Sequence, residues 1–400
     1  MIKIGFVIAN PLSEGLGFSL RPRMLIKYLS LHEDIEIHVY TPFSEVRNEF
    51  KNVHFHKMKT LYNFSGLEKI TYRASRIMIK RKFFANNLMY RSFTLNKIVK
   101  GLAQSLTEQL KKNPVDLLQA EQDIVAAAAV LSKKLCNIPV IADIHDLWAD
   151  EEVLVGRIES ESHAFKAINN ISKIALLESD AILVGNPLIK SILQSRFSLG
   201  SSKIVISPNG GELLEVGLPK QRKRRVVYAG NLESYEYIDL FVQAASYIMK
   251  EDKSIEISIF GKGPDEKRLR NMAKKQGLPT SIFKGFIQRS RLIPILMESS
   301  VGAVPTKKEY ATPMKPFEYF SAGLPIVSIK GMWWTEVMER YHAGLSSAFE
   351  PKEFAEAISA LINSADLNQY ARGAIEVVKK EYNWYNITEN LISVYKKLIL

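Results

Sequence analysis

The sequence predicts an α/β protein made of two tandem doubly wound domains, each similar to a Rossmann fold. The chain has 400 residues, too many for one ordinary domain. Short apolar segments alternate with helical patterns, which is typical of parallel βαβ units. The alternation restarts after a basic stretch at 217–225. We therefore expect a ligand site in the cleft between two domains, where the carboxyl ends of both sheets face each other.

The first domain begins with a predicted strand at 2–9, a loop that contains Gly15 and Gly17, and a helix at 20–31. This order of strand, glycine loop and helix is the usual start of a doubly wound domain. We expect its further strands at 35–40, 53–56, 115–119, 139–143, 181–184 and 204–207.

The second domain follows the basic stretch at 217–225, which we interpret as a solvated linker in preference to a contact for substrate phosphate. Its strands are expected at 226–229, 255–260, 282–286, 301–304 and 325–329. The last segment, 384–400, has apolar residues near helical spacing, so we expect an amphipathic helix that packs on the rest of the chain.

The composition is that of a soluble globular protein, with 46% hydrophobic and 24% charged residues. No apolar run reaches the ~20 residues needed to span a bilayer, and the first ten residues do not resemble a secretory signal. The single cysteine, Cys136, can form no internal disulfide, and no cysteine cluster is present to hold a metal. We expect a cytoplasmic protein without a metal cofactor.

The net charge of +12 comes from one part of the chain. Between Lys57 and Lys112 there are thirteen Lys and Arg residues against two acids. Within this part, residues 69–91 have the pattern of a basic amphipathic helix. It fits a solvated helix packed on the core, or contact with an anionic membrane surface or a lipid-phosphate acceptor, which we favour. Nucleic acid is disfavoured, because no nucleic-acid motif accompanies the segment.

Residues 304–327 carry the most specific pattern: a strand, a loop, a helix and a second strand. Pro313 and Pro316 suit a helix start, where a missing N–H costs little. A helix amino terminus attracts a diphosphate, and Lys315 adds a full positive charge there. Glu318, one turn later, carries a carboxylate that suits the hydroxyls of a ribose.

This stretch resembles the donor-binding segment of the retaining glycosyltransferases of family 4 (glycosyl transferases group 1), which have the GT-B fold and include relatives of sucrose synthase and phosphatidylinositol mannosyltransferase. In that family Glu, Gly, Phe, Pro, four residues and Glu lead into Ala-Met-Ala-x-Gly-x-Pro-Val. Here Tyr310-Ala-Thr-Pro313 precedes Met-Lys-Pro-Phe and then Glu318-Tyr-Phe-Ser-Ala-Gly-Leu-Pro-Ile-Val327. The chain is similar to the subgroup with Pro-x-Lys-x-Phe-Glu-Tyr in this place.

Further segments resemble the same family in order and spacing. They are the interdomain Pro-Asn-Gly loop at 207–212, the first donor-domain strand and its glycine turn at 227–232, the Gly-x-Gly-Pro turn at 259–264, the nucleobase segment at 283–286, the strand end with His145 at 141–148, and Tyr-Asn-Trp at 382–384.

The resemblance implies a GT-B protein that moves a sugar from a nucleotide diphosphate sugar to an acceptor. The transfer would need no metal and would retain the anomeric configuration. It implies an acceptor-side domain at 1–210, a linker at 211–225, a donor domain at 226–380 and a helix at 381–400 that packs back on the first domain. The implied catalytic residues are His145, Lys315 and Glu318. The implied donor-binding residues are Gly230, Asn231, Lys262, Phe286, Tyr310, Thr312, Pro313, Met314, Lys315 and Glu318, with Gly15 and Gly17 in an acceptor or phosphate loop.

The chain also departs from the family pattern. Tyr310, with Glu309 beside it, stands where the family's first Glu contacts the sugar, and Asn231 and residues 233–237 replace the Arg and Lys that hold the diphosphate. We therefore expect Lys315 to take more of the phosphate charge, helped by Lys262 or by an amino-domain arginine such as Arg21 or Arg23.

Several alternatives stay open at the level of sequence. His145, flanked by Asp143 and Asp146, fits a metal pair or a hydrogen-bonded histidine at a strand end. Gly15 and Gly17 fit a simple turn as well as a ligand loop. A nucleotide-sugar enzyme of another type, such as an epimerase, or a catalytically silent binding partner would share the two-domain architecture.

Overall fold

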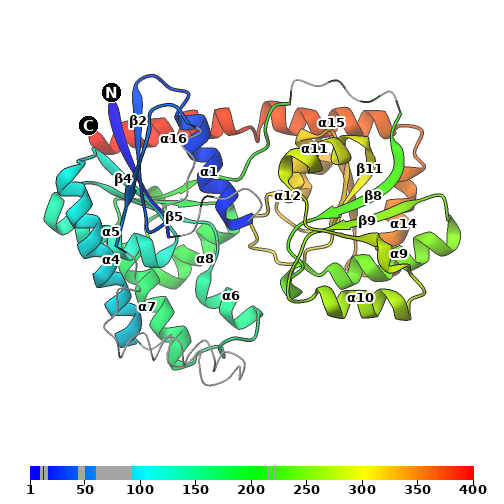
Figure 1. Cartoon of the computed structure of the whole chain (residues 1–400), viewed down its shortest axis with the longest axis horizontal. Helices are drawn as coiled ribbons and strands as arrows, with labels where there is room; N and C mark the ends of the chain where they lie inside the picture. Colours follow the sequence, from blue (N-terminus) through cyan, green and yellow to red (C-terminus); the bar gives the residue numbers. More distant parts are fainter. Residues whose placement is uncertain are drawn as a thin grey trace. The chain divides into compact units, whose positions relative to one another are not determined.

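The computed structural model describes residues 1–9, 12, 17–43, 50–59, 92–214, 217, 219 and 221–400. The chain divides into two compact units, each with its own sheet (Figure 1). Unit 1 comprises Met1–Ser13, Phe18–Pro208 and Thr388–Leu400, and unit 2 comprises Glu14–Gly17 and Asn209–Ile387. The basic segment 69–91 and Gly15 lie outside the described residues.

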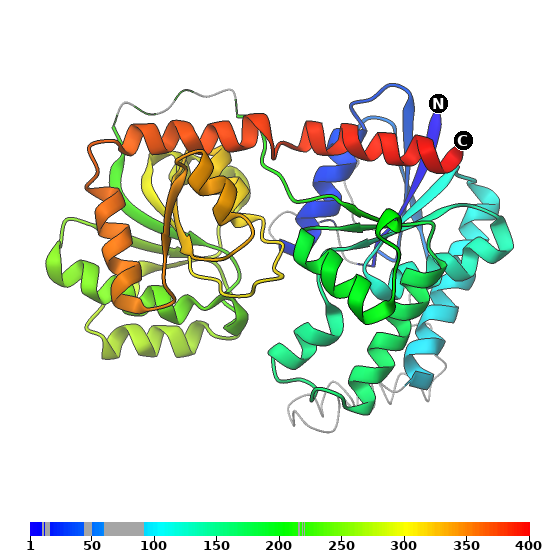
Figure 2. The same cartoon turned by 180° about the vertical axis from the view of Figure 1, so that it is seen from behind.

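Unit 1 contains a parallel seven-stranded sheet in the order β3-β2-β1-β4-β5-β6-β7. Its strands are β1 (Ile2–Val7), β2 (Ile35–Thr41), β3 (Val53–Lys57), β4 (Leu117–Glu121), β5 (Val140–Ile144), β6 (Ala181–Val184) and β7 (Ile204–Ile206). The described helices of this unit are α1 (Gly17–Leu29), α4 (Ser92–Lys112), α5 (Asp123–Cys136), α6 (Trp148–Leu154), α7 (His163–Glu178) and α8 (Pro187–Phe197), joined by most of α16 (Trp384–Ile399). Helices α4, α5 and α7 pack against one another (Figure 2).

Unit 2 contains a parallel six-stranded sheet in the order β10-β9-β8-β11-β12-β13. Its strands are β8 (Lys223–Ala229), β9 (Glu256–Phe260), β10 (Phe283–Gly285), β11 (Ser299–Val304), β12 (Ile326–Ile329) and β13 (Gly344–Ser347). Its described helices are α9 (Ile238–Glu251), α10 (Glu266–Lys275), α11 (Arg289–Glu298), α12 (Lys315–Ser321), α13 (Thr335–Arg340), α14 (Pro351–Ile362) and α15 (Leu367–Lys380). Helix α9 packs against α10 and α14, and α12 packs against α15 (Figure 1). The prediction of two doubly wound α/β domains is confirmed.

The strand order reverses once in each sheet. In unit 1 the chain runs from β1 to β2 and β3 on one side and returns at β4 on the other side of β1. In unit 2 it runs from β8 to β9 and β10 and returns at β11 beside β8. Ligands of open α/β sheets bind outside the carboxyl ends of the strands at such a reversal. The two edges to inspect are therefore β1/β4 and β8/β11.

The central strands are buried on both faces, as parallel strands usually are. Every residue of β4 and β5 is buried, including the polar Gln119, Glu121 and Asp143. The predicted strand at 115–119 was placed two residues too early, because the polar residues at its end look like the start of a loop. Buried polar groups need partners, so these three side chains indicate a polar network inside unit 1.

Strand β8 begins at Lys223, inside the stretch 217–225 that the sequence suggested as a linker. Arg222 anchors this start, because its guanidinium donates to the carbonyl oxygens of Met297, Ser299 and Gly323 at 2.9, 2.7 and 2.8 Å. Burial lowers the pKa of Arg222 to about 10. The basic residues next to β8 are thus partly structural.

No helix within the described ranges is both long and apolar enough to cross a membrane.

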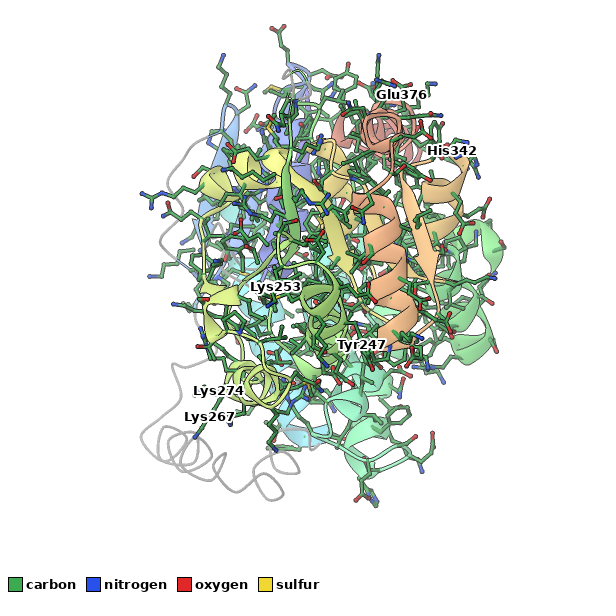
Figure 3. All side chains as sticks on the ribbon, turned by 90° about the vertical axis from the view of Figure 1, so that its right-hand side faces the viewer. Tyr247, Lys253, Lys267, Lys274, His342 and Glu376 are labelled. Atoms are coloured by element: carbon green, nitrogen blue, oxygen red, sulfur yellow. The ribbon has the colours of Figure 1, made fainter. Side chains whose placement is uncertain are left out.

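One outer face of unit 2 carries exposed lysines. Figure 3 labels Lys253, Lys267 and Lys274, which project from the surface there, and Lys267 and Lys274 both belong to α10.

Candidate nucleotide site and a buried polar network

The first candidate site lies in unit 2, at the reversal between β8 and β11. Residues 230–237 follow β8, and residues 305–314 lead from β11 into α12. Helix α12 contributes both Lys315 and Glu318 from its first turn. The carboxyl ends of two neighbouring strands and the start of one helix therefore bring the two best sequence candidates together.

Lys315 lies across the turn that follows β8. A Cβ at Gly230 would be 2.7 Å from Lys315 Cε, so the lysine side chain lies directly over this glycine. The ammonium Nζ donates to Glu236 Oε1 at 2.7 Å and lies 5.5 Å from the centre of the Tyr228 ring. The Lys315 and Glu236 side chains are only 12% and 14% exposed. A lysine of this kind is a partly buried cation with its counter-ion already in place.

The Gly261-Lys-Gly turn after β9 has a structural role. Gly261 has φ 141°, and a Cβ there would be 1.8 Å from the carbonyl oxygen of Gly230. The two turns are also joined by backbone bonds, from Gly230 N to Phe260 O at 3.0 Å and from Leu232 N to Lys262 O at 3.0 Å. Glycine at position 261 thus allows the loops after β8 and β9 to stay close enough for backbone hydrogen bonds beyond the ends of the two strands.

Glu318 is held by an arginine that the sequence did not single out. Arg289, the first residue of α11, donates from Nε to Glu318 Oε1 at 2.8 Å and from Nη1 to Glu212 Oε2 at 2.5 Å. The side chains of Arg289, Glu318 and Glu212 are 22%, 19% and 10% exposed. Burial by itself lowers the pKa of Arg289, but the two carboxylates outweigh it and the pKa of Arg289 is raised.

The loop between β11 and α12 is fixed from two sides. Asn209 Nδ2 donates to the carbonyl oxygen of Thr312 at 2.6 Å, and Trp333 Nε1 donates to that of Ala311 at 2.7 Å. Lys308, which is 8% exposed, lies 4.9 Å from the centre of the Tyr310 ring and 5.6 Å from that of Tyr235. Such cation–π contacts hold a lysine without neutralising it.

The other predicted donor-binding residues lie around the same edge. Pro313 and Met314 are half-buried at the end of the loop, and Asn231 is half-buried in the turn after β8. Phe286, 48% exposed, lies just after β10, and Lys262 Nζ is 5.9 Å from the centre of its ring. Glu309 is exposed while its neighbour Tyr310 is half-buried.

Unit 1 contains a buried network around Asp143. Arg21 donates to Asp143 from Nη2 at 3.0 Å and from Nε at 3.2 Å, and both side chains are 2% exposed. Gln119 Nε2 donates to Asp143 Oδ2 at 2.9 Å, and Tyr395 Oη donates to Gln119 Oε1 at 2.5 Å. Arg21 Nη1 also donates to the carbonyl oxygen of Pro208 at 3.2 Å. The network joins α1, β4, β5 and α16.

This network corrects one expectation. Arg21 was expected to help hold a substrate phosphate, but the structure shows its guanidinium buried and bound to Asp143. Arg23 has a different environment, with Nη1 3.5 Å from the carbonyl oxygen of Leu12 and its guanidinium over the Phe50 ring at 5.4 Å. Asp143 thus accepts from both Arg21 and Gln119 in the interior of unit 1.

His145 follows β5 and is 7% exposed. Its Nε2 lies 3.8 Å from Glu121 Oε1 at the end of β4. Burial, and then the negative charge of Asp143, raise the pKa of Glu121 well above its ordinary value, with Arg21 acting in the opposite direction. Glu121 is thus a buried acid that prefers to keep its proton.

The structure therefore brings Lys315, Glu318, Gly230 and Asn231 to one edge of unit 2, while His145 belongs to unit 1. Sequence reasoning missed Arg289, Glu236 and Glu121. Glu236 lies in the segment 233–237, where the resembling family has cations, and this departure could have drawn attention to it. Glu121 could have been noticed as a carboxylate at the end of a buried strand. Nothing in the sequence around Arg289 marks it.

Within the described residues, no group of three or more His, Cys, Asp or Glu side chains is arranged to hold a metal ion. His145, Asp143 and Asp146 therefore form no such group, and Asp143 accepts hydrogen bonds from Arg21.

Comparison with known proteins extends these observations. Over its full length the chain is similar to a solved structure of sucrose-phosphate synthase from Thermosynechococcus elongatus, with a TM-score of 0.74 at 15% identity and coverage of 100% of this chain and 99% of that one. The fold is GT-B. A structure of Anabaena HepE in complex with UDP is also similar, with a TM-score of 0.68 at 12% identity over 99% of this chain and 100% of that one.

Sequence comparison agrees with the GT-B fold. Residues 223–364 match the family model described as glycosyl transferases group 1. A Haemophilus influenzae protein described as an uncharacterized glycosyltransferase is 23% identical over 337 residues, covering 81% of this chain and 91% of the relative. The family model thus covers the part of the GT-B chain that contains Lys315, Glu318 and Arg289. These similarities support a glycosyltransferase function.

Proposed function

We propose that this GT-B protein transfers a sugar from a nucleotide diphosphate sugar to an acceptor with retention of configuration, and that unit 2 binds the donor nucleotide. One observation carries the proposal: α12 presents Lys315 and Glu318 from a single turn where the order of the unit 2 sheet reverses. A cation for the diphosphate and a carboxylate for the ribose are the two groups that a nucleotide diphosphate needs there.

Lys315 is the principal cation in this proposal. Helix α12 is only seven residues long, and Pro316 has no N–H to offer in its first turn. The helix terminus therefore contributes little, and the full charge of Lys315 stabilises the diphosphate as it leaves. Lys308 and Lys262 lie on the loops that flank the same edge and would add to the positive field. The exposed Phe286 is a suitable surface for the nucleobase.

His145 would hold the hydroxyls of the transferred sugar, and Glu318 the ribose. Departure of the diphosphate leaves an oxocarbenium-like sugar, and the leaving phosphate can accept the proton of the acceptor hydroxyl, so no dedicated protein base is needed. This arrangement is expected to work without a metal. Gly15 and Gly17 remain assigned to an acceptor or phosphate loop.

The acceptor is proposed to be a lipid phosphate or a glycan at the cytoplasmic face of a membrane, because residues 69–91 contribute seven positive charges and no acid to the basic part of the chain at 57–112. Co-sedimentation with vesicles of phosphatidylcholine, with and without phosphatidylglycerol, tests this at several salt concentrations. Binding should need the anionic lipid and fall as salt rises. Equal recovery with both vesicle types would contradict it.

The donor proposal is tested with a panel of nucleotide sugars. Because a similar structure contains UDP, UDP sugars come first, followed by GDP and ADP sugars. Wild-type protein should release the nucleoside diphosphate in the presence of an acceptor, and NMR of the product should show the anomeric configuration of the donor. An inverted product would contradict the retaining mechanism. Tight binding of a nucleoside diphosphate without any turnover would indicate a silent binding protein.

A further inference from the structure

We propose that Arg289 is a positioning residue that orients the Glu318 carboxylate toward the hydroxyls of the nucleotide's ribose. The inference rests on the proposed nucleotide site and adds a residue to it. Arg289 contacts Glu318 through Nε at 2.8 Å, so the guanidinium fixes one carboxylate oxygen of Glu318. Its Nη1 is fixed in turn by Glu212. Glu318 is therefore attached to a braced group instead of moving freely on α12.

The chemistry of a carboxylate explains why one fixed oxygen matters. An ionised carboxylate offers about four lone-pair positions on two oxygens. The Nε bond uses one of them, so acceptor capacity for two hydroxyl groups remains. Hydrogen bonds to a carboxylate are also stronger than those between neutral groups. A diol such as the 2′ and 3′ hydroxyls of ribose needs both oxygens in a defined plane, which a braced carboxylate supplies.

The position of Arg289 in the chain supports the same interpretation. It lies three residues after Phe286, the proposed nucleobase surface, and it begins α11 at the carboxyl end of β10. Glu212 lies soon after the point where the chain enters unit 2 at Asn209. Arg289 thus links three segments around one edge of the sheet. A purely structural brace would have the same contacts, so the test must measure something that a brace does not change.

The distinguishing measurement is the preference for a 2′ hydroxyl. Titration calorimetry gives the Kd of the diphosphates of uridine, guanosine and adenosine and of the 2′-deoxy form of each, in the absence of any acceptor. Of the three ribonucleoside diphosphates, the one that wild-type protein binds most tightly should bind at least tenfold more tightly than its 2′-deoxy form. Arg289→Leu should reduce this ratio to below threefold, as should Glu318→Ala. Glu212→Gln should keep most of the ratio, because the bond between Arg289 and Glu318 survives.

Two further variants make the result clear. Arg289→Lys retains a cation but not the two-sided fork, so its ratio should fall between wild type and Arg289→Leu, and thermal unfolding should show that it folds. Arg340 is a matched control, because it also donates to two carboxylates, Glu336 at 2.8 Å and Glu381 at 3.1 Å, elsewhere in unit 2. Arg340→Leu should keep the wild-type ratio.

The possible results separate the two proposals. If wild type binds no nucleoside diphosphate, the nucleotide site itself is refuted, and the role of Arg289 with it. If wild type binds and prefers the ribonucleotide, but folded Arg289→Leu and Arg289→Lys keep the full ratio, then the site stands and Arg289 is only a structural brace. Loss of the ratio in Arg340→Leu would also overturn the inference, since any disturbance of unit 2 would then have the same effect.

Discussion

Replacing Lys315 by methionine gives the sharpest test of the proposed donor site. Methionine keeps most of the length of the side chain over Gly230 but removes the ammonium. In the native protein this ammonium lies 2.7 Å from Glu236 Oε1. The variant therefore removes a positive charge and also exposes a carboxylate to the bound diphosphate. The local charge from this pair changes from neutral to negative.

The size of the effect follows from these two contributions. A hydrogen bond to a charged group contributes ~1.5–3 kcal/mol, which corresponds to about 12- to 160-fold in Kd. The unpaired carboxylate repels each unit of phosphate charge by up to ~3 kcal/mol at about 6 Å with an effective dielectric constant of about 20. Solvent and salt reduce this repulsion, because the Lys315 and Glu236 side chains are 12% and 14% exposed. We expect Kd for UDP to rise at least ~30-fold in Lys315→Met.

The double variant Lys315→Met with Glu236→Gln separates the two contributions. Removing the carboxylate should recover part of the loss, so the double variant should bind UDP more tightly than Lys315→Met alone but more weakly than wild type. Glu236→Gln alone should bind UDP no more weakly than wild type, because it frees Lys315 from its counter-ion. The coupling between the two positions is obtained from the complete double-mutant cycle.

Titration calorimetry with UDP and with uridine at two salt concentrations measures these differences. The loss should appear with UDP and be small with uridine, since only UDP carries the phosphates. Lys274→Met is a matched control, because Lys274 is an exposed lysine near the carboxyl end of α10 (Figure 3) and should leave Kd unchanged. Wild-type affinity for UDP in Lys315→Met, or weaker binding in the double variant than in the single one, would refute the reasoning.

Three further predictions concern stability. Burial raises the pKa of Asp123 from 3.8 to about 6, so the native state resists its ionisation and loses stability as pH rises from about 4 to 6. In urea unfolding, Asp123→Asn should be more stable than wild type by up to ~3 kcal/mol above pH 6 and equally stable below pH 4. A stability difference between variant and wild type that does not change with pH would exclude this cause. Tyr395→Phe leaves Gln119 Oε1 without its donor and should lower the free energy of unfolding by ~1–3 kcal/mol, whereas an unchanged urea midpoint would mean that the bond contributes nothing. Gly261→Ala places a Cβ against the Gly230 carbonyl at positive φ and should cost at least ~2 kcal/mol; wild-type thermal stability would contradict this.

The fold could be predicted from the sequence because its signals are local. Apolar segments of strand length and the helices between them depend on neighbouring residues, so most of their order was recovered. The edge strand β13 (Gly344–Ser347) was missed, because Leu345 is its only large apolar residue. The errors occur where a buried strand carries polar residues. The strand expected at 115–119 lies at Leu117–Glu121, because Glu121 at its buried end looked like a loop residue, since a polar residue at a strand end usually marks the surface.

The candidate site could be predicted only in part. Lys315 and Glu318 were found because helix-start chemistry and the resemblance to a family lie in one continuous stretch. Their partners are distant in sequence: Glu236 is 79 residues from Lys315, and Arg289 is 29 residues from Glu318. Only the reversal of strand order between β8 and β11 brings these segments together. A pattern read along one chain contains no such information.

The partners also change what the departures from the family mean. In the sequence, residues 233–237 stood out because they lack the cations that hold the diphosphate in the family. In the structure this segment supplies Glu236 to Lys315 and Tyr235 to Lys308, so it positions two lysines that come from the far side of the reversal. In the proposed site the positive charge therefore comes from Lys308 in the β11–α12 loop and from Lys315 at the start of α12. Because the Lys315 ammonium is already paired with Glu236, a phosphate at the proposed site would have to displace Glu236 or share the ammonium with it. Glu236 is therefore expected to influence donor affinity.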